Sequence, residues 1–288
     1  MTENLIVYKR LPIWTAATLP DMVKEKHNTK VGTWGKLTIL QGQLKFFDLD
    51  EAGQVLEEHI FSPETETPFV EPQAWHKVEA LSPDLECYLE FYCRPRDYFS
   101  KKYNLTAVHS EVLEASETVP VGKALDLGCG QGRNALFLNQ LGFEVTAVDR
   151  NPLSLEILAS IIDQEDLDLE LASYDINQAS LIGDYDFILS TVVFMFLDSE
   201  RVPAIIADMQ DHTKLGGYNL IVCAMDTASH PCTMPFSFTF KEGELKEYYK
   251  DWELIKYNEN LGKLHKRDEN GRRIELQFAT MLAKKIKS

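Results

Sequence analysis

The hydrophobic pattern changes character about a third of the way along the chain. Up to residue 95, short apolar runs such as Leu37–Leu40, Leu44–Phe47 and Leu85–Tyr92 alternate with turn residues. Beyond residue 96, apolar runs of strand length alternate with longer helical patterns. The first pattern is typical of a small β-sandwich or barrel, and the second of a doubly wound α/β sheet. We therefore expect an all-β domain over residues 1–95 and an α/β domain over residues 96–288.

The second part predicts a mostly parallel sheet with helices between its strands. An amphipathic helical region, Tyr98–Ala115, should precede the first strand. Asn270–Gly271 is typical of a two-residue hairpin turn, which would place Asp268 opposite Arg273. The predicted strands are Ala124–Leu127, Val145–Val148, Leu167–Leu171, Asp186–Thr191, Tyr218–Ala224, Trp252–Tyr257 and Ile274–Lys284. The predicted helices are Asn134–Leu141, Pro152–Ile162, Ser199–His212 and Lys241–Lys250.

A glycine-rich turn follows the first of these strands. Gly128, Gly130 and Gly132 alternate with other residues, so the pattern is D-x-G-x-G-x-G. The dinucleotide pattern G-x-G-x-x-G would need its third glycine at position 133, which is Arg133. Strand, glycine turn, helix and strand together predict a Rossmann-like nucleotide-binding unit that does not hold a pyrophosphate.

Acidic residues at the ends of these strands indicate the kind of ligand. Asp126 beside the turn would repel a pyrophosphate but suits an ammonium group. Asp149 ends the second strand, where it can accept hydrogen bonds from ribose hydroxyls. Asp175 follows the third strand, where it can accept from an adenine amino group beside the backbone of Ile176. An ammonium, a ribose and an adenine without phosphate describe S-adenosyl-L-methionine. The alternative is a glycine-rich turn without this ligand, but it leaves the two strand-end acids unexplained.

Further residues should border the same ligand. Thr191 ends the fourth strand, and a helix that precedes the first strand often covers the ligand cleft, which brings in Tyr98, Tyr103 and His109. These three are equally compatible with an ordinary place in the core. The complete set predicted to bind the cofactor is Tyr98, Tyr103, His109, Asp126, Gly128, Gly130, Arg133, Asn134, Asp149, Arg150, Asp175, Ile176 and Thr191.

Length, composition and charge limit the number of domains, the classes of binding partner and the cellular compartment. The 288 residues suit about two domains, and a net charge of −16 argues against binding to nucleic acid or an acidic membrane. No apolar run approaches the roughly 18 residues of a membrane-spanning helix, and the N-terminus lacks a signal-peptide pattern. Five scattered cysteines without a C-x-x-C pair indicate reduced thiols and a cytoplasmic protein. The sequence leaves open whether the chain forms homo-oligomers.

The first part shows a faint likeness to the cupin fold. HNTKVGTWGKLTILQGQLKFF and EPQAWHKVEAL resemble its two strand motifs. A metal-binding cupin carries three histidines and a glutamate, whereas only His27 and His76 fall near the required places. We therefore expect a cupin-like β-domain without a metal, and no metal site elsewhere.

The part from about Arg96 to Lys285 resembles the TehB family of tellurite-resistance methyltransferases. The likeness rests on YFSKKYNLTAVHSEVLEA, LDLGCGQGRNALFL, YDFILSTVVFMFL, GYNLIVCAMDTASHPCT, FKEGEL and LHKRDENGRRIELQFATMLAKK. The all-β part resembles the extension of longer members. The resemblance implies a class I methyltransferase sheet and methyl transfer from S-adenosylmethionine to tellurite, and to related selenium compounds.

One cationic cluster stands out in this acidic chain. Its members are Lys263, His265, Lys266, Arg267, Arg272 and Arg273. Since arginine suits an oxyanion, we predict that His265, Lys266 and Arg273 hold a tellurite or selenite substrate. The alternative is a solvated hairpin whose charges pair across the strands. For the whole chain, the alternatives are methyl transfer to another small nucleophile, such as a thiol, and a non-catalytic sensor of S-adenosylmethionine. A redox role for Cys129 or Cys232 stays open.

Overall fold

The fold comes from a computed structural model that describes residues 4–267 and 269–287; the side chains of His265 and Lys266 lie outside the described part. The chain divides into two compact units, Met1–Leu105 and Thr106–Ser288. Each unit is described by itself. In the described residues, no helix has the length and apolarity needed to span a membrane.

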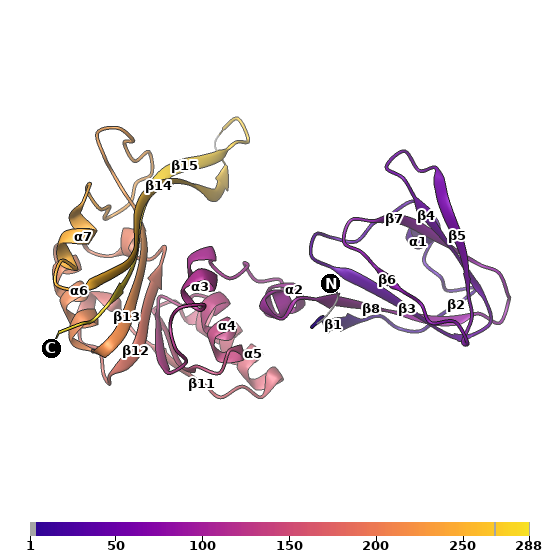
Figure 1. Cartoon of the computed structure of the whole chain (residues 1–288), viewed down its shortest axis with the longest axis horizontal. Helices are drawn as coiled ribbons and strands as arrows, with labels where there is room; N and C mark the ends of the chain where they lie inside the picture. Colours follow the sequence, from indigo (N-terminus) through magenta and orange to yellow (C-terminus); the bar gives the residue numbers. More distant parts are fainter. Residues whose placement is uncertain (1–3, 268, 288) are drawn as a thin grey trace. The chain divides into compact units, whose positions relative to one another are not determined.

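The first unit is built from two antiparallel sheets (Figure 1). The larger sheet has the order β1-β8-β3-β6, with β2 paired to β8, and the smaller has the order β5-β4-β7. Buried residues from both sheets form one core, which includes Leu37 and Cys87 of the larger sheet and Leu44, Phe46 and Val78 of the smaller. The elements are β1 (Ile6–Arg10), β2 (Trp14–Thr15), α1 (Asp21–Lys24), β3 (Trp34–Gln41), β4 (Leu44–Leu49), β5 (Val55–Phe61), β6 (Phe69–Val70), β7 (Trp75–Ala80), β8 (Glu86–Cys93), η1 (Pro95–Asp97) and α2 (Tyr98–Tyr103). The predicted all-β domain is thus a two-sheet sandwich.

The amphipathic region predicted over Tyr98–Ala115 is two helices. Helix α2 ends at Asn104, which has the left-handed backbone (φ 55°) that closes a helix, and α3 (Ser110–Ala115) starts afresh. The Lys101 ammonium of α2 donates to Val31 O at 2.8 Å and to Thr33 Oγ1 at 3.0 Å. These bonds tie α2 to the first unit, which is why that unit extends ten residues past the boundary predicted at residue 95.

The second unit is a seven-stranded sheet in the order β11-β10-β9-β12-β13-β15-β14. The first five of these pair in parallel, and β15 runs antiparallel to both of its neighbours. The doubly wound, mostly parallel α/β sheet predicted from the sequence is confirmed. The strands are β9 (Lys123–Leu127), β10 (Glu144–Asp149), β11 (Leu169–Ser173), β12 (Tyr185–Thr191), β13 (Thr213–Ala224), β14 (Glu253–Arg267) and β15 (Arg273–Lys284).

Helices cover both faces of this sheet (Figure 1). They are α4 (Arg133–Gln140), α5 (Pro152–Glu165), η2 (Ile176–Gln178), η3 (Phe194–Phe196), η4 (Ser199–Arg201), α6 (Val202–Asp211) and α7 (Glu244–Tyr248). Helix α6 buries Ile205 and Met209 in the same core cluster as Leu125 and Leu127 of β9. Because side chains alternate along a strand, Asp126 points to the opposite face, the face of α4. The order of the strands reverses between β9 and β12, so the expected crevice lies where β9 ends.

The hairpin at the end of the chain differs from the prediction. Strand β14 continues ten residues past Tyr257, and the residue paired with Arg273 is Arg267. The prediction of a two-residue Asn270–Gly271 turn that places Asp268 opposite Arg273 is therefore wrong, and Asp268 lies outside the described residues. Pairing with β15 favours this extension, because β15 supplies hydrogen-bond partners for the backbone N–H and C=O groups of β14. The polar side chains of this segment do not by themselves predict a strand.

Candidate functional site

The glycine turn closes directly on the end of β9. The amides of Gly128 and Cys129 donate to Val148 O of β10 at 2.9 and 3.0 Å, which fixes the turn against the neighbouring strand. Gly128 has φ +78°, and a Cβ there would lie 2.6 Å from Val193 Cγ2. Gly130 has φ +55° with no atom within 4 Å of such a Cβ. The first glycine is therefore needed for packing, whereas the second presents bare backbone to open space.

Asp149 holds the turn as well as facing the ligand space. Its Oδ2 accepts from Gly130 N, and its Oδ1 accepts from Asn151 N, both at 2.8 Å. Each carboxylate oxygen keeps a further lone pair, and Asp149 lines an open cavity of about 280 Å³ at this edge of the sheet. The geometry leaves the side chain able to accept from two ribose hydroxyls, which is the role predicted for it.

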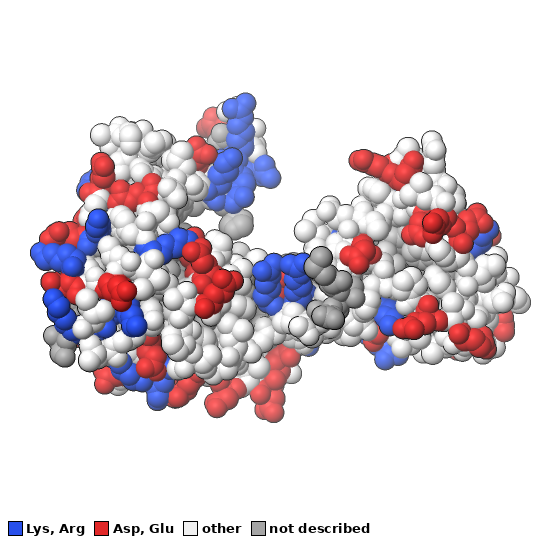
Figure 2. Space-filling view, in the orientation of Figure 1, with Lys and Arg blue, Asp and Glu red and all other residues white. Residues whose placement is uncertain are grey.

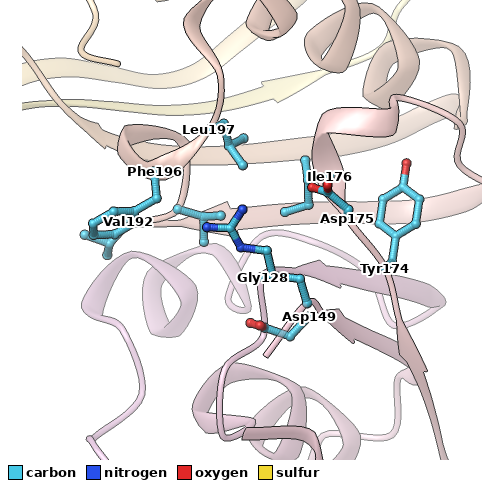
Figure 3. Close-up of a pocket in the computed structure, with 10 residues that line it drawn as sticks. Gly128, Asp149, Tyr174, Asp175, Ile176, Val192, Phe196 and Leu197 are labelled. Carbon is cyan, nitrogen blue, oxygen red and sulfur yellow. The ribbon is translucent and has the colours of Figure 1, made fainter. Parts of the chain in front are cut away.

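The cavity brings together residues at the carboxyl ends of four strands, β9, β10, β11 and β12 (Figure 3). Four predicted residues besides Asp149 line it: Gly128, Arg150, Asp175 and Ile176. Asp175 caps η2 by accepting from Asn177 N at 3.1 Å, which fixes its carboxylate beside the buried Ile176. An adenine-sized ring would meet an acceptor and an apolar wall there.

Five further residues line the cavity that the sequence did not indicate: Tyr174, Val192, Val193, Phe196 and Leu197. Phe196 is 55% exposed although it is a large apolar residue, and Val192 has φ +62°. A positive φ is strained for a β-branched residue and is commonest at functional sites. The signal available in the sequence was the apolar run that directly follows β12, the central strand beyond the switch point.

Asp126 is the least satisfied group of the site. It is 1% exposed, and its Oδ2 accepts no hydrogen bond from any described residue. Burial raises the pKa of Asp126 to about 7, although Arg133 nearby acts in the opposite direction. A buried acceptor without a donor is costly, so a cationic group that reached Oδ2, directly or through one water, would be bound favourably. The ammonium of an amino-acid end is such a group.

Four residues predicted to bind the cofactor are joined by hydrogen bonds and are not among the residues that line the cavity. Asn134 is 3% exposed; its Oδ1 accepts from His109 N at 3.1 Å, and its Nδ2 donates to Thr191 Oγ1 at 3.0 Å. Arg133 Nη2 lies 3.5 Å from the same hydroxyl. These bonds join the start of α3, the start of α4 and the end of β12. Asn134 and Thr191 therefore position the turn, while a direct contact with the cofactor stays a prediction.

His109 is a neutral hydrogen-bond donor in this arrangement. Its Nδ1 accepts from Glu111 N at 3.2 Å, so the proton of the neutral ring lies on Nε2. Burial, and then the charge of Arg133, lowers the pKa of His109 to about 4. Arg133 and His109 thus offer one cation and one N–H, a set suited to a carboxylate. Tyr98 and Tyr103 belong to α2 in the first unit, so their predicted role stays a prediction.

The basic hairpin extends past the edge of the sheet at which the cavity lies. The last residue of β13 that pairs with β15 is Ala224, opposite Phe278. Residues 273–277 of β15 and the facing part of β14 therefore project beyond the carboxyl end of β13. Figure 2 shows Lys and Arg side chains gathered at this tip, where Lys263, Arg267, Arg272 and Arg273 are exposed.

The hairpin is linked to the turn through α3. Lys256 of β14 forms ion pairs with Glu111 and Glu114 at 2.7 and 2.6 Å, and His109 is the N-cap of α3. Arg273 donates from Nε to Leu264 O and from Nη2 to Lys263 O, both at 2.7 Å. Its guanidinium thus stabilises the hairpin, and these two bonds to the described residues use two of its five N–H groups. The side chains of His265 and Lys266, which were predicted with it, lie outside the described residues.

The two cysteines considered for redox chemistry are unlike each other. Burial raises the pKa of the Cys129 thiol, so it stays protonated and a poor nucleophile. Cys232 is half-buried in the loop after β13, where its amide donates to Asp226 Oδ1 at 2.9 Å. Cys129 therefore serves the turn as a small side chain.

Comparison with known proteins identifies the family. The sequence model described as tellurite resistance protein TehB matches residues 91–282, and the model described as TehB-like domain matches residues 9–89. The chain belongs to the TehB family. This confirms the family predicted from the sequence, and with it S-adenosylmethionine as the cofactor.

Individual relatives agree with this family. A protein of Haemophilus influenzae strain 10810, named a probable S-adenosyl-L-methionine-dependent methyltransferase TehB, is 61% identical over 99% of this chain and 100% of its own. The crystal structure of TehB from Haemophilus influenzae superposes with a TM-score of 0.95 over the same shares at 61% identity. Hemagglutinin 1 of Eikenella corrodens is 56% identical over 83% of this chain and 80% of its own.

The residues present fit the cofactor at each of its ends. Asp126 would take the ammonium, Arg133 and His109 the carboxylate, Asp149 the ribose, and Asp175 with Ile176 the adenine. Two observations support this fit: Asp126 Oδ2 is buried without a donor among the described residues, and the Cβ position of Gly130 faces open space. When bound, the cofactor supplies a sulfonium methyl group to a nucleophile.

Replacement of Asp149 by Ala is expected to weaken the binding of S-adenosylmethionine by about 1.5–3 kcal/mol, because charged hydrogen bonds are lost. Calorimetry on the purified chain measures the effect, and NAD should not bind at all. Asp149→Asn is the control, because its amide oxygen can still accept from Gly130 N. The role assigned to Asp149 is wrong if the Ala variant binds as tightly as the original chain.

Proposed function

We propose that this S-adenosylmethionine-dependent methyltransferase of the TehB family transfers the methyl group to tellurite, and to related selenium oxyanions, as a detoxification reaction. The proposal is supported by the family that the chain matches over residues 91–282 and by one structural observation. In a chain of net charge −16, exposed cations gather on a hairpin that projects past the edge of the sheet where the cofactor is expected.

Methyl transfer to tellurite requires the protein mainly to position the two reactants. The lone pair on tellurium forms the Te–C bond while the C–S bond breaks, so the sulfonium becomes a thioether and tellurium is oxidised. No side chain has to accept a proton from such a nucleophile. The chain has to hold the oxyanion in line with the methyl group and exclude water, and orientation of this kind removes much of a reaction barrier.

The cations of the hairpin are the groups that would hold the oxyanion. Arg273 is kept in one orientation by the carbonyls of Lys263 and Leu264, and its remaining N–H groups can bind two oxygens of one anion. His265 and Lys266 are neighbours of this arginine in the paired strand and stay in the proposal as predicted. Four apolar residues that line the cavity would form the dry wall of the site: Val192, Val193, Phe196 and Leu197.

Replacement of Arg273 by Ala is expected to raise the KM for tellurite about tenfold, which corresponds to about 1.4 kcal/mol of lost transition-state binding. His265→Ala should act in the same direction. Arg273→Lys should recover only part of the loss, because a lysine lacks the planar fork. Affinity for S-adenosylmethionine should stay unchanged, since the bonds that Arg273 makes to the described residues are both to the hairpin. Steady-state kinetics with tellurite, together with calorimetry, measure both effects.

Arg267→Ala is the matched control for this series. Arg267 also bonds to the hairpin backbone, from Nη1 to Gly271 O at 2.6 Å, and its loss removes the same charge. If the Arg267 and Arg273 variants change KM equally, Arg273 acts through the hairpin's shape or charge and does not bind the anion.

The function itself is tested by incubating the chain with S-adenosylmethionine and tellurite, selenite or a small thiol. We expect S-adenosylhomocysteine and a methylated chalcogen product with the two oxyanions. Transfer to the thiol alone would support methylation of another small nucleophile. Cofactor binding without transfer to any of the three would support the sensor.

A further inference from the structure

A second cavity lies within the first unit, and its lining residues are not among those used above for methyl transfer. Its volume is about 410 Å³, and all of its lining residues fall between Tyr8 and Lys101. Leu37 of β3, Leu44 and Phe46 of β4 and Val78 of β7 form its inner wall, and all four are buried core residues. The space therefore opens between the two sheets of the sandwich. Its size and its apolar lining are those of a small-molecule site.

The charged side chains among the described residues that line this cavity are all positive. Lys9, Lys30 and Lys101 line it, and among the described residues that do so there is no Asp or Glu, in a chain of net charge −16. Lys9 and Lys30 are exposed, whereas the inner wall is buried. Lys101 is held against the wall by its bonds to Val31 O and Thr33 Oγ1. The cavity is thus apolar where it is buried and positively charged where it is exposed.

Two imidazoles add fixed acceptors to the lining. His27 and His76 pair across an isolated bridge, with ring centroids 4.1 Å apart. The Nδ1 of His27 donates to Glu25 O at 3.0 Å, and the Nδ1 of His76 donates to Ala74 O at 2.8 Å, since a carbonyl can only accept. Burial, and then His27, lowers the pKa of His76 to about 4. His76 is therefore neutral near pH 7, and its Nε2, for which no bond to the described residues is seen, is an acceptor.

We propose that this cavity binds an amphipathic small molecule, with an apolar ring-sized body against Phe46 and Leu44 and one anionic group at Lys9, Lys30 and Lys101. Burial of the body supplies most of the affinity, at about 25 cal/mol per Å², and the lysines select for the anion. The same residues are poorly suited to bind a metal ion. Two imidazoles are fewer ligands than a zinc site uses, and the described lining residues include no cysteine or carboxylate to complete a set.

The test uses a pair of dyes that differ in one charge. 8-Anilinonaphthalene-1-sulfonate has an apolar body and one sulfonate, and N-phenyl-1-naphthylamine has the same body without it. Both are titrated by fluorescence into the full chain in the presence of excess S-adenosylhomocysteine, which fills the cofactor cleft. We expect the anionic dye to bind with a Kd at least tenfold lower than that of the neutral dye.

Variants place the dye in the cavity. Lys9→Gln combined with Lys30→Gln should raise the Kd of the anionic dye at least tenfold and leave that of the neutral dye unchanged. Lys24→Gln removes a charge from the same unit, on an exposed residue of α1 that does not line the cavity, and should change neither. Val78→Phe fills part of the space and should weaken both dyes at least fivefold, with a thermal melt to confirm folding.

Three results would overturn the proposal. The first is equal binding of the two dyes with no effect of the lysine variants. The second is unchanged binding in a folded Val78→Phe variant, which would place the dyes elsewhere. The third is a zinc chloride titration that saturates at one ion per chain, is lost in His76→Gln and is unaffected by either dye, which would assign the two imidazoles to a metal.

Discussion

Replacement of Asp126 by Asn is expected to weaken the binding of S-adenosylmethionine at least tenfold while making the unbound protein more stable at pH 8. Asp126 is 1% exposed and one of its oxygens has no donor among the described residues. A buried carboxylate with an oxygen that has no donor destabilises the fold. The Asn side chain keeps the shape without the charge, so the free energy of unfolding should rise by about 1–3 kcal/mol.

The same carboxyl predicts how stability and binding depend on pH. Burial raises the pKa of Asp126 to about 7 from an ordinary value of 3.8. Below pH 3.8 the group is protonated in both folded and unfolded chains. As the pH rises to 7, the unfolded chain loses this proton first, so the group's contribution to stability is lost over that window, by at most about 4 kcal/mol. The Asn variant should lack this part of the pH dependence.

Cofactor affinity should change with pH in the opposite direction. An ammonium prefers the charged carboxylate, so affinity should fall as the pH drops from 8 to 6 and the free protein takes up a proton. Calorimetry in buffers of different ionisation enthalpy should show a proton released on binding near pH 6.5. The Asn variant should bind equally at both ends of this range.

A ligand without the amino-acid end provides the control. 5′-Methylthioadenosine carries the adenine and ribose but no ammonium, so Asp126→Asn should leave its affinity unchanged at every pH. Equal losses for this nucleoside and for S-adenosylmethionine would mean that the substitution disturbs the turn as a whole. In that case the assignment of Asp126 to the ammonium is wrong.

Replacement of Gly128 by Ala is expected to lower the free energy of unfolding by about 2–4 kcal/mol. The new Cβ would lie 2.6 Å from Val193 Cγ2, and the backbone has φ +78°. Steric overlap in a packed interior and a left-handed backbone each destabilise, and together they belong to the upper range for single substitutions. Denaturant unfolding of the purified chain measures the change.

A double-mutant cycle separates the two causes. Val193→Ala removes the methyl groups that meet the new Cβ, so Gly128→Ala made in that background should destabilise by only about 1 kcal/mol, the cost of the left-handed backbone. Gly130→Ala is the matched single variant, because its φ is +55° and nothing lies within 4 Å of its Cβ. If Gly128→Ala and Gly130→Ala destabilise equally, contact with Val193 is not the reason for the first glycine.

The sequence by itself determined the elements and the place of the ligand. Glycines at alternate positions after an apolar run, and acids at the ends of successive runs, are local features that strand periodicity and turn chemistry translate directly into structure. They sufficed to predict the α/β fold and the cofactor. They also indicated four residues that line the cavity at this edge of the sheet together with Asp149. The distinctive stretches from Arg96 onward sufficed for the family.

Only the tertiary structure determined which of these side chains are engaged in hydrogen bonds within the protein and which can still bind a ligand. Asn134, Thr191 and His109 bond to one another across 25 and 57 positions of sequence, and the order of the strands, not any local pattern, makes them neighbours. The same holds for Arg273, whose partners are backbone carbonyls of a strand that the sequence had ended ten residues too early. Asp126 is the opposite case: its position was predictable, but the lack of a donor to its Oδ2 among the described residues was not. Hydrogen-bond partners distant in sequence are chosen by the packing of strands and helices, and only the folded chain contains that information.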